Sequence, residues 1–329
     1  MEIKGKRILI TGAGGFIGSH LTKKLVSMKA DVRALVRYNS RGDHGMLEFM
    51  PAEMKEKVDI IMGDLRDAET ILNTVKNIDI VFHLGALIAI PYSYLRPREV
   101  IETNIMGTLN VLNAARASNV KKIIHTSTSE VYGTSRYVPI DENHPLQGQS
   151  PYSASKIGAD KIAESFYRSY DLPVATIRPF NTYGPGQSSR AVIPTIISQA
   201  LKSDTVYLGS LHPTRDLTYV EDTVNAFIKV AESDRSIGEV VNIGSNFEIP
   251  IGELAEKIFA LMGKPLKIIS TDERSRPEKS EVQRLWADNS KAGQLIGWAP
   301  RVTLDDGLEK TIEWIRENIE RFKTDTYNL

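Results

Sequence analysis

The sequence contains no cysteine in 329 residues. A chain without thiols forms no disulfide, has no thiolate nucleophile, and cannot hold zinc or an iron–sulfur cluster through cysteine. It also has no net charge, because 41 lysine and arginine residues balance 41 aspartate and glutamate residues. Without an extended positive field, we expect neither nucleic acid nor an anionic membrane as a partner. Any anionic ligand must therefore be held by local groups.

Long hydrophobic runs are also missing. No stretch of about 18 apolar residues occurs, which is what a membrane-spanning helix needs, and the charged start, residues 1–7, has no apolar signal-peptide core. We therefore expect a soluble, cytoplasmic protein. A chain of this length buries about three quarters of its unfolded surface, so its core needs no structural metal, and we expect no metal site.

Short apolar runs rich in β-branched residues alternate with amphipathic stretches through the first half of the chain. This alternation predicts βαβ units in an α/β fold: a Rossmann-type doubly wound parallel sheet, with a smaller C-terminal substrate-binding α/β lobe. We place the cofactor-binding domain at residues 1–180 and the lobe at 181–329, with some segments interleaved. The predicted strands are 7–11, 32–36, 58–62, 80–83, 122–126 and 174–177, and the predicted helices are 16–28, 68–75, 97–117, 150–170 and 304–322.

Three glycines, Gly12, Gly15 and Gly18, lie between the first predicted strand and the first predicted helix. Glycine at this spacing allows a tight turn, close approach of the backbone to a pyrophosphate, and close helix–strand packing. The free N–H groups of the helix start favour an anion. We therefore expect these glycines, with Phe16 and Ile17, to bind a dinucleotide.

The second predicted strand decides which dinucleotide is expected. An acidic residue at its end binds the adenosine ribose of NAD, whereas an arginine there accommodates the 2′-phosphate of NADP. Arg37 and Arg41 follow this strand, which slightly favours NADP. Asp43 or a backbone group could still serve NAD, and both arginines could be solvated surface residues.

Tyr152 and Lys156 are one turn apart on a predicted helix that Ser150 can cap and Pro151 can open. Tyrosine titrates near pH 10 and is a poor base at neutral pH. A nearby ammonium group stabilises tyrosinate, so we expect Lys156 to lower the pKa of Tyr152 and make it a base for a sugar hydroxyl. The same pair also occurs by chance on many helices.

The fifth predicted strand is followed by Thr128, Ser129 and Glu130. In a doubly wound sheet, this strand end faces the ligand crevice. A hydroxyl there can hydrogen-bond both Tyr152 and the substrate, and a carboxylate can act as a base. Each has a plainer alternative, since hydroxyl residues are common at strand ends and Glu130 could be solvated.

Together these segments resemble an extended short-chain dehydrogenase/reductase of the NAD(P)-dependent nucleotide-sugar epimerase/dehydratase family. The resemblance spans nearly the whole chain. The segments that carry it are residues 11–18, Thr128, Tyr152 with Lys156, residues 181–185 and residues 215–222.

The resemblance implies roles for further residues. It implies that Thr128, Tyr152 and Lys156 form a catalytic triad and that Asn104 is a structural asparagine. The residues implied to contact the cofactor are Asp64, Leu65, Leu84, Gly85 and Ala86, and those implied to bind the substrate are Ser93, Asn181, Arg215 and Arg276. Either arginine could instead be structural.

The residues beside Thr128 distinguish the reactions of this family. The resemblance implies that 4,6-dehydratases carry Thr-Asp-Glu there, whereas this chain has Thr-Ser-Glu, which keeps the base Glu130 but lacks the acid. Residues 90–94 are similar to those of GlcNAc-nucleotide 4,6-dehydratases. We therefore expect dehydration of UDP-GlcNAc or GDP-GlcNAc, with Ser129 or an ordered water relaying the proton. The alternatives are a UDP-hexose 4-epimerase, a UDP-glucuronate decarboxylase and a non-catalytic cofactor-binding regulator.

The resemblance has two further implications. The cofactor, NADP or NAD, is regenerated in each turnover and should stay tightly bound. Family members commonly dimerise through helices that correspond to residues 104–118 and 150–170, so we expect a homodimer.

Overall fold

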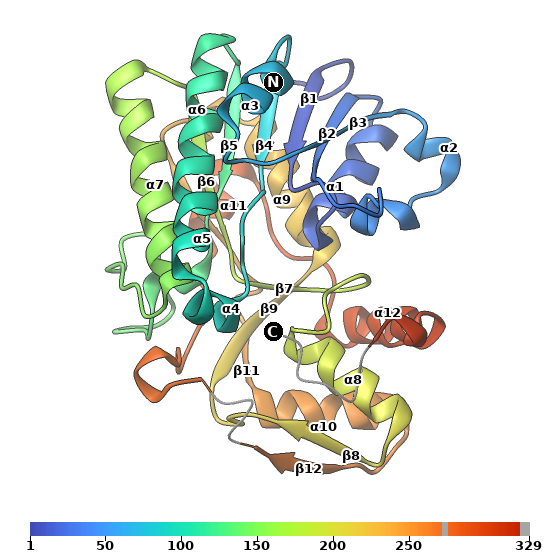
Figure 1. Ribbon diagram of the computed structural model, residues 1–329. Helices are drawn as coiled ribbons and strands as arrows, with labels where there is room; N and C mark the ends of the chain where they lie inside the picture. The colour runs from blue at the N-terminus through green and yellow to red at the C-terminus, as the bar shows by residue number, and fades with distance from the viewer. Residues whose placement is uncertain (272–275, 323–329) are drawn as a thin grey trace.

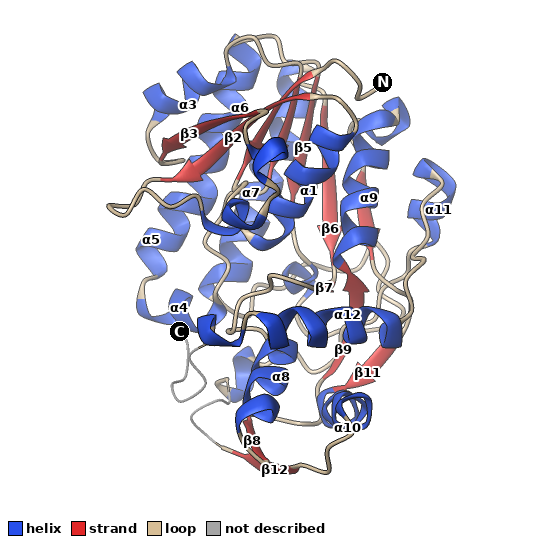
Figure 2. Ribbon diagram, turned by 90° about the vertical axis from the view of Figure 1, so that its right-hand side faces the viewer, coloured by secondary structure: helices blue, strands red, loops and turns tan. Residues whose placement is uncertain are grey.

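The computed structural model describes residues 1–271 and 276–322, and its centre is a seven-stranded parallel sheet between two layers of helices (Figures 1 and 2). The sheet confirms the predicted Rossmann-type fold. In spatial order its strands are β10 (Val240–Ile243), β6 (Val174–Pro179), β5 (Lys122–Thr126), β4 (Ile80–His83), β1 (Arg7–Thr11), β2 (Asp31–Arg37) and β3 (Val58–Gly63).

Helices cover both faces of this sheet. Successive side chains of a strand point to opposite faces of the sheet, so Leu9 enters one hydrophobic core whereas Ile8 and Ile10 enter the other. One face carries α3 (Ala68–Val75), α6 (Gly107–Ala117) and α7 (Pro151–Tyr170), and the other carries α1 (Phe16–Ser27) and α9 (Val220–Glu232).

The predicted helix 97–117 is interrupted in its first half. It consists of α5 (Pro97–Ile101), a π-helical turn (Glu102–Met106) and α6. The turn carries Asn104, whose buried amide accepts a hydrogen bond from Leu87 N (2.8 Å) and donates to Leu87 O and to Ser155 Oγ (both 2.9 Å). Such turns often mark functional sites, and this one joins the segment after β4 to α7.

The second lobe lies below the carboxyl ends of the strands (Figure 1). It contains two small sheets, one with three strands and one with two, and three main helices. The elements are β7 (Asn181–Tyr183), β9 (Thr214–Tyr219) and β11 (Glu248–Pro250), then β8 (Thr205–Leu208) and β12 (Lys267–Ser270), with α8 (Val192–Lys202), α10 (Ile251–Met262) and α12 (Leu304–Glu317).

The lobes are interleaved along the chain. Helix α9 and strand β10 follow residue 180, yet they complete the large sheet and its helix layer. One hydrophobic core runs without a break from Ile8 and Phe82 in the large sheet to Ile196 and Leu308 in the lobe.

The short connecting helices lie near the junction between the lobes or beside the sheet. The final helix is shorter than the predicted 304–322, because α12 ends at Glu317 and one 3₁₀ turn follows it. The connecting helices are α2 (Ala52–Lys55), α4 (Ile90–Leu95) and α11 (Ser290–Ile296), and the 3₁₀ turns are Gly45–Phe49, Ser129–Tyr132, Asp234–Ser236, Glu278–Ser280 and Ile319–Arg321.

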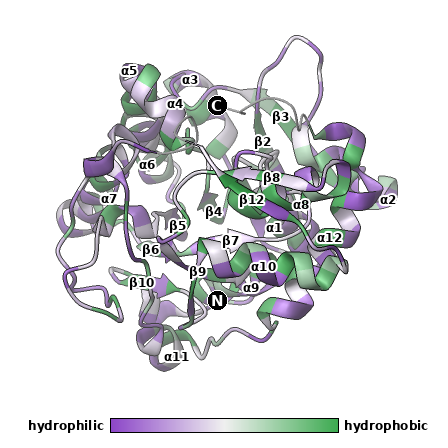
Figure 3. Cartoon of the chain, turned by 90° about the horizontal axis from the view of Figure 1, so that it is seen from below, coloured by the Kyte–Doolittle hydropathy of each residue, from purple (hydrophilic) through white to green (hydrophobic). Residues whose placement is uncertain are grey.

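Figure 3 views the molecule from the lobe end, where β8 and β12 each combine parts coloured as hydrophobic with paler or hydrophilic parts. Within the part of the chain that the structure describes, no helix combines the length and apolar character needed to cross a bilayer.

Candidate active site

The glycine-rich turn follows β1 at the carboxyl edge of the large sheet. Gly12 has φ of +74°, and a Cβ atom there would lie 2.7 Å from Gly85 N. A Cβ atom on Gly18 would lie 2.2 Å from Gly12 O. These positions admit only glycine, because any side chain would meet backbone atoms that cannot move aside.

The start of α1 fits an anionic group. Its N-cap is Gly15, and no side chain caps the helix, so the N–H groups of the first turn, which begins with Phe16 and Ile17, have no side-chain acceptor. Uncapped N–H groups and the helix dipole suit a diphosphate. The predicted loop residues therefore come together in an arrangement that could hold a dinucleotide.

The predicted cofactor stretch after β4 lies directly against this turn. Leu84 N donates to Thr11 O (3.2 Å), and Gly85 N donates to Thr11 Oγ1 (3.0 Å). The buried ring of His83 bridges Thr11 Oγ1 (2.8 Å) and Thr108 Oγ1 (3.0 Å). Burial holds the pKa of His83 well below its usual value, so the ring is a neutral brace between β1, β4 and α6.

Asp64 and Leu65 follow β3 at the same edge. Leu65 borders the stretch after β4, since a Cβ atom on Gly85 would lie 2.8 Å from its Cδ1. Asp64 accepts hydrogen bonds from Arg66 Nε (3.0 Å) and Nη2 (2.6 Å), which hold the pKa of its carboxyl below the usual value.

Arg37 and Arg41 both have carboxylate partners near the end of β2. Arg37 Nη2 donates to Glu99 Oε1 (3.3 Å), and Arg41 Nε donates to Asp43 Oδ2 (3.1 Å). Both side chains stay mostly exposed, at 64% and 84%. Exposed pairs of this kind are weak, so a phosphate could compete for either guanidinium.

The predicted catalytic residues come together where α7 crosses the end of β5. A capping box between Ser150 and Ser153 fixes the start of α7. The buried phenol of Tyr152 is hydrogen bonded to Thr128, and Lys156 Nζ donates to Thr126 O (2.6 Å). A hydroxyl, a phenol and an amine therefore lie within one turn of helix and one strand end.

The electrostatics of Tyr152 differ from the sequence-based expectation. Burial raises the pKa of Tyr152 above its usual value, and the hydrogen bond to Thr128 only partly offsets this rise. The expectation that Lys156 lowers the pKa of Tyr152 is therefore wrong. Burial also lowers the pKa of Lys156 to about 8. The ammonium form of Lys156 therefore still predominates at neutral pH.

Glu130 lies in the 3₁₀ turn after Thr128 and is 8% exposed. Its backbone N–H donates to Thr128 Oγ1 (3.3 Å), and its Oε1 is 3.7 Å from Arg276 Nη1. Ser129 is buried beside it, at 2% exposed. Glu130 is therefore a nearly enclosed carboxylate beside the Thr128–Tyr152 pair, and it is not a solvated surface residue.

Arg215 and Arg276 approach from the second lobe and share Glu281, which sequence reasoning missed. Glu281 Oε1 lies 3.0 Å from Arg215 Nη2 and 3.7 Å from Arg276 Nη1. Arg215 Nη1 also donates to Thr214 O and Val282 O (both 2.9 Å). The sequence carries no motif that could have identified Glu281.

Asn181 opens β7 between the lobes, and its Oδ1 is buried without a hydrogen-bond partner among the described residues. A buried amide oxygen with no donor is costly unless a ligand or water satisfies it. Asn181 therefore fits the predicted substrate role.

Ser93 does not join this group. Its hydroxyl donates to Ile90 O (2.6 Å) within α4, and the residue is completely buried. The prediction that Ser93 binds substrate is not supported by this arrangement, because a helical serine satisfies its hydroxyl on the preceding turn.

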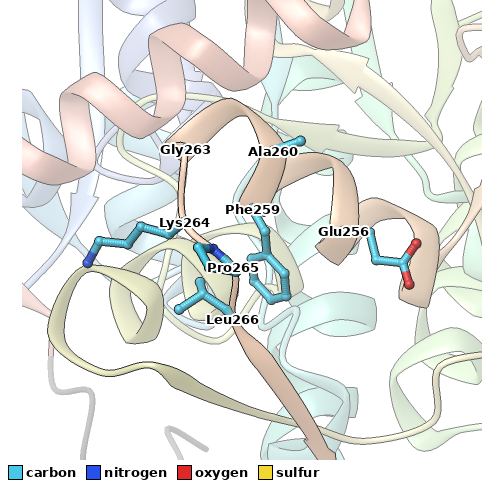
Figure 4. Close-up of a pocket in the computed structure, with 7 residues that line it drawn as sticks. All are labelled: Glu256, Phe259, Ala260, Gly263, Lys264, Pro265 and Leu266. Carbon is cyan, nitrogen blue, oxygen red and sulfur yellow. The ribbon is translucent and has the colours of Figure 1, made fainter.

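A hollow of about 420 Å³ lies elsewhere, on the second lobe beside the end of α10 (Figure 4). Phe259 and Leu266 form its apolar part, and none of the predicted site residues lines it. Among residues 1–271 and 276–322, no three histidine or acidic side chains converge as metal ligands would.

A family model described as GDP-mannose 4,6 dehydratase matches residues 9–311. The chain belongs to this family. The mouse dTDP-D-glucose 4,6-dehydratase is 32% identical to it over 97% of this chain and 91% of that protein. The match confirms the resemblance to extended short-chain dehydrogenases/reductases that act on nucleotide sugars.

Solved structures of dehydratases and epimerases resemble this member of the GDP-mannose 4,6-dehydratase family equally well. The dTDP-glucose 4,6-dehydratase DesIV from Streptomyces venezuelae, solved with NAD, has a TM-score of 0.86 and 28% identity, covering 96% of this chain and 99% of that one. The UDP-N-acetylglucosamine 4-epimerase from Methanobrevibacter ruminantium has a TM-score of 0.85 and 31% identity, with the same coverage. The chain is therefore an enzyme of the dehydratase/epimerase family.

The glycine turn makes a direct prediction. Gly18→Ala should lower the free energy of unfolding by about 1–3 kcal/mol and weaken dinucleotide binding, because the new methyl group meets Gly12 O. Thermal unfolding and calorimetric titration with NAD and NADP measure both effects.

Gly252→Ala in α10 is the matched control. Its Cβ atom would be no closer than 3.6 Å to any neighbour, so stability should change by at most about 1 kcal/mol. Equal behaviour of the two variants would contradict the steric argument.

Proposed function

We propose that the protein is a nucleotide-sugar 4,6-dehydratase that converts UDP-GlcNAc or GDP-GlcNAc to the 4-keto-6-deoxy sugar. The observation that carries this proposal is the enclosed carboxylate of Glu130 beside Thr128 and Tyr152. A dehydratase needs a base for the proton on C5, whereas C4 oxidation alone does not.

The first step is oxidation at C4. Tyr152 takes the proton of the 4-hydroxyl, and the hydrogen bond to Thr128 favours its phenolate. Lys156, still largely protonated at neutral pH, supplies the positive charge that a buried phenolate needs. A bound nicotinamide cofactor would supply the hydride acceptor for C4 and the hydride donor for C6.

The second step removes water. The 4-ketone acidifies the C5 proton, and Glu130 takes it and gives it back to C5 when hydride is added at C6. The 6-hydroxyl leaves as water after it receives a proton relayed by Ser129 or an ordered water, which takes the place of the acid that the Thr-Ser-Glu triplet lacks. No external reductant is consumed, so the cofactor has no reason to leave between turnovers.

Arg215, Arg276 and Asn181 form the proposed diphosphate site. The two guanidiniums meet near Glu281 and Glu130, and charge-assisted hydrogen bonds from arginine are strong and specific for phosphate.

A UDP-hexose 4-epimerase is the second candidate. An epimerase needs only Thr128, Tyr152 and Lys156, and epimerases are among the solved structures that this chain resembles. This function leaves the position of Glu130 unexplained. A UDP-glucuronate decarboxylase, which shares the Thr-Ser-Glu triplet, has less support, because the segments around Tyr152 and Arg215 are similar to those of dehydratases.

Mass spectrometry of the product separates these functions. Incubation with UDP-GlcNAc, and separately with GDP-GlcNAc, should give a product lighter by one water molecule. In the Glu130→Gln variant that product should disappear while C4 oxidation, followed as cofactor reduction, remains. An unchanged product mass with a changed C4 configuration, read by NMR of the product, would support the epimerase, and full dehydration by Glu130→Gln would refute the role of Glu130.

Cofactor preference is a separate prediction. We propose that NADP binds somewhat more tightly than NAD, since β2 ends in Arg37 with Arg41 nearby. In Arg37→Ser the ratio of the two dissociation constants should change by about tenfold in favour of NAD. Arg7→Ser, at the opposite end of the sheet, is the control and should leave the ratio unchanged. Tighter binding of NAD by the unmodified protein would overturn the preference.

We also propose a homodimer formed through the helices at 104–118 and 150–170. Ile101 and Met106, on the turns that lead into α6, are 45% and 47% exposed, which leaves apolar surface for a partner copy. Light scattering should give twice the mass of the chain, and a monomer at all concentrations would contradict the proposal.

A further inference from the structure

A buried carboxylate lies one helical turn beyond the catalytic pair. Tyr152, Lys156 and Asp160 are spaced four residues apart on α7, so they share one face of the helix. Asp160 is 5% exposed and takes no part in the reaction steps proposed above. A buried charge is retained only where surrounding groups compensate for it.

Donors from two neighbouring strands hold this carboxylate. Ser127 Oγ donates to Asp160 Oδ2 (2.6 Å), Arg178 Nη2 donates to the same oxygen (3.0 Å), and His125 Nε2 lies 2.9 Å from Oδ1. Burial alone would raise the pKa of Asp160, but His125, Arg178 and Lys156 together lower it to about 2. Asp160 is therefore an anion at any pH at which the enzyme works.

The same contacts fix the register between α7 and the end of β5. Asp160 holds the side chains of His125 and Ser127, while Lys156 holds the carbonyl of the residue between them, Thr126. Thr128, the hydrogen-bond partner of Tyr152, is the next residue. A shift of this strand end would separate Thr128 from Tyr152.

The structure assigns Asp160 the role of positioning residue for the catalytic pair: its carboxylate joins α7 to the end of β5 and places a fixed negative charge beside Lys156. That charge favours the ammonium form of Lys156, which would otherwise lose its proton in so buried a site. The inference rests on the proposed function only in that Tyr152 and Lys156 carry out C4 oxidation.

Other titratable or charged groups face this cluster from the neighbouring elements. The buried histidines are kept neutral by burial, which lowers the pKa of both, so Asp160 is the negative charge that acts on Lys156. The groups are His83 on β4, His125 on β5, Arg178 on β6, Glu130 and Tyr132 in the 3₁₀ turn, and Tyr152 on α7.

The test replaces the charge while keeping the shape. In Asp160→Asn, the Lys156 ammonium should lose its proton about one pH unit lower than in the unmodified protein. NMR of isotope-labelled lysine at the ε-carbon measures this titration without substrate or cofactor, and Lys156→Arg assigns the signal. Asp160→Glu keeps the charge, so its titration should stay near that of the unmodified protein. An unmoved titration in Asp160→Asn would overturn the inference.

Enzyme kinetics give the matching readout. The alkaline limb of the pH profile of cofactor reduction should move to lower pH in Asp160→Asn by the same amount, whereas a purely structural role would lower the rate at every pH alike. Asp222→Asn, which alters a buried carboxylate on α9 that accepts from Arg301 N and Val302 N (both 2.9 Å), should leave the limb in place. A limb that moves equally in both variants would contradict the inference.

If Asp160→Asn does not fold, Arg178→Lys provides the opposite change. Lysine keeps the positive charge but withdraws the forked donors from Asp160, so more of its negative charge acts on Lys156 and the titration should move to higher pH. No movement, or a movement to lower pH, would overturn the inference. A shifted titration together with an absence of dehydration would refute the proposed function alone.

Discussion

The site depends on the contact between α7 and the end of β5. Within a few residues, this contact sets the phenol of Tyr152 against Thr128, the amine of Lys156 against the backbone of Thr126, and the carboxylate of Asp160 against Ser127. Each of these groups is buried, and a buried polar group is stable only with its partner in place. The same contacts therefore position the groups of the proposed chemistry and stabilise this helix–strand junction.

A second junction relates the dinucleotide loop to the rest of the sheet. The backbone of the turn after β1 packs directly against the backbone of the segment after β4. His83, through its hydrogen bonds to Thr11 and Thr108, connects both strands to α6. Asn104 continues the connection, since one amide binds both the backbone of Leu87 and the hydroxyl of Ser155 on α7. Loop and catalytic helix are thus linked through one short chain of buried hydrogen bonds.

Much of this could be predicted from the sequence, because its strongest signals are local. The strand and helix periods located most elements of the large sheet, and the glycine spacing located the turn at Gly12. Strand β10 was missed because it follows the segments of the second lobe, outside the regular alternation of strands and helices in the first half of the chain. The π turn at 102–106 was missed, and its residue Asn104 bonds to Leu87, a contact between residues that are distant in sequence.

The electrostatic details could not be predicted for the same reason. Sequence spacing placed Lys156 near Tyr152, but burial, which raises the pKa of that phenol, is a property of the assembled fold. Glu281 and Asp160 have no motif that distinguishes them from surface carboxylates, and only their buried partners identify them. Ser93 is the opposite case: its segment resembled a substrate-binding one, but its hydroxyl is already hydrogen bonded within its own helix.

The position of β10 and α9 in the large sheet has a consequence for biosynthesis. The ribosome releases both elements only after β7, α8, β8 and β9 of the second lobe, so a nascent chain that stops at residue 180 lacks an edge strand and the helix that covers Phe82. The dinucleotide half of the molecule therefore cannot be cut out as an N-terminal fragment, and it reaches its final form only when most of the polypeptide has been made.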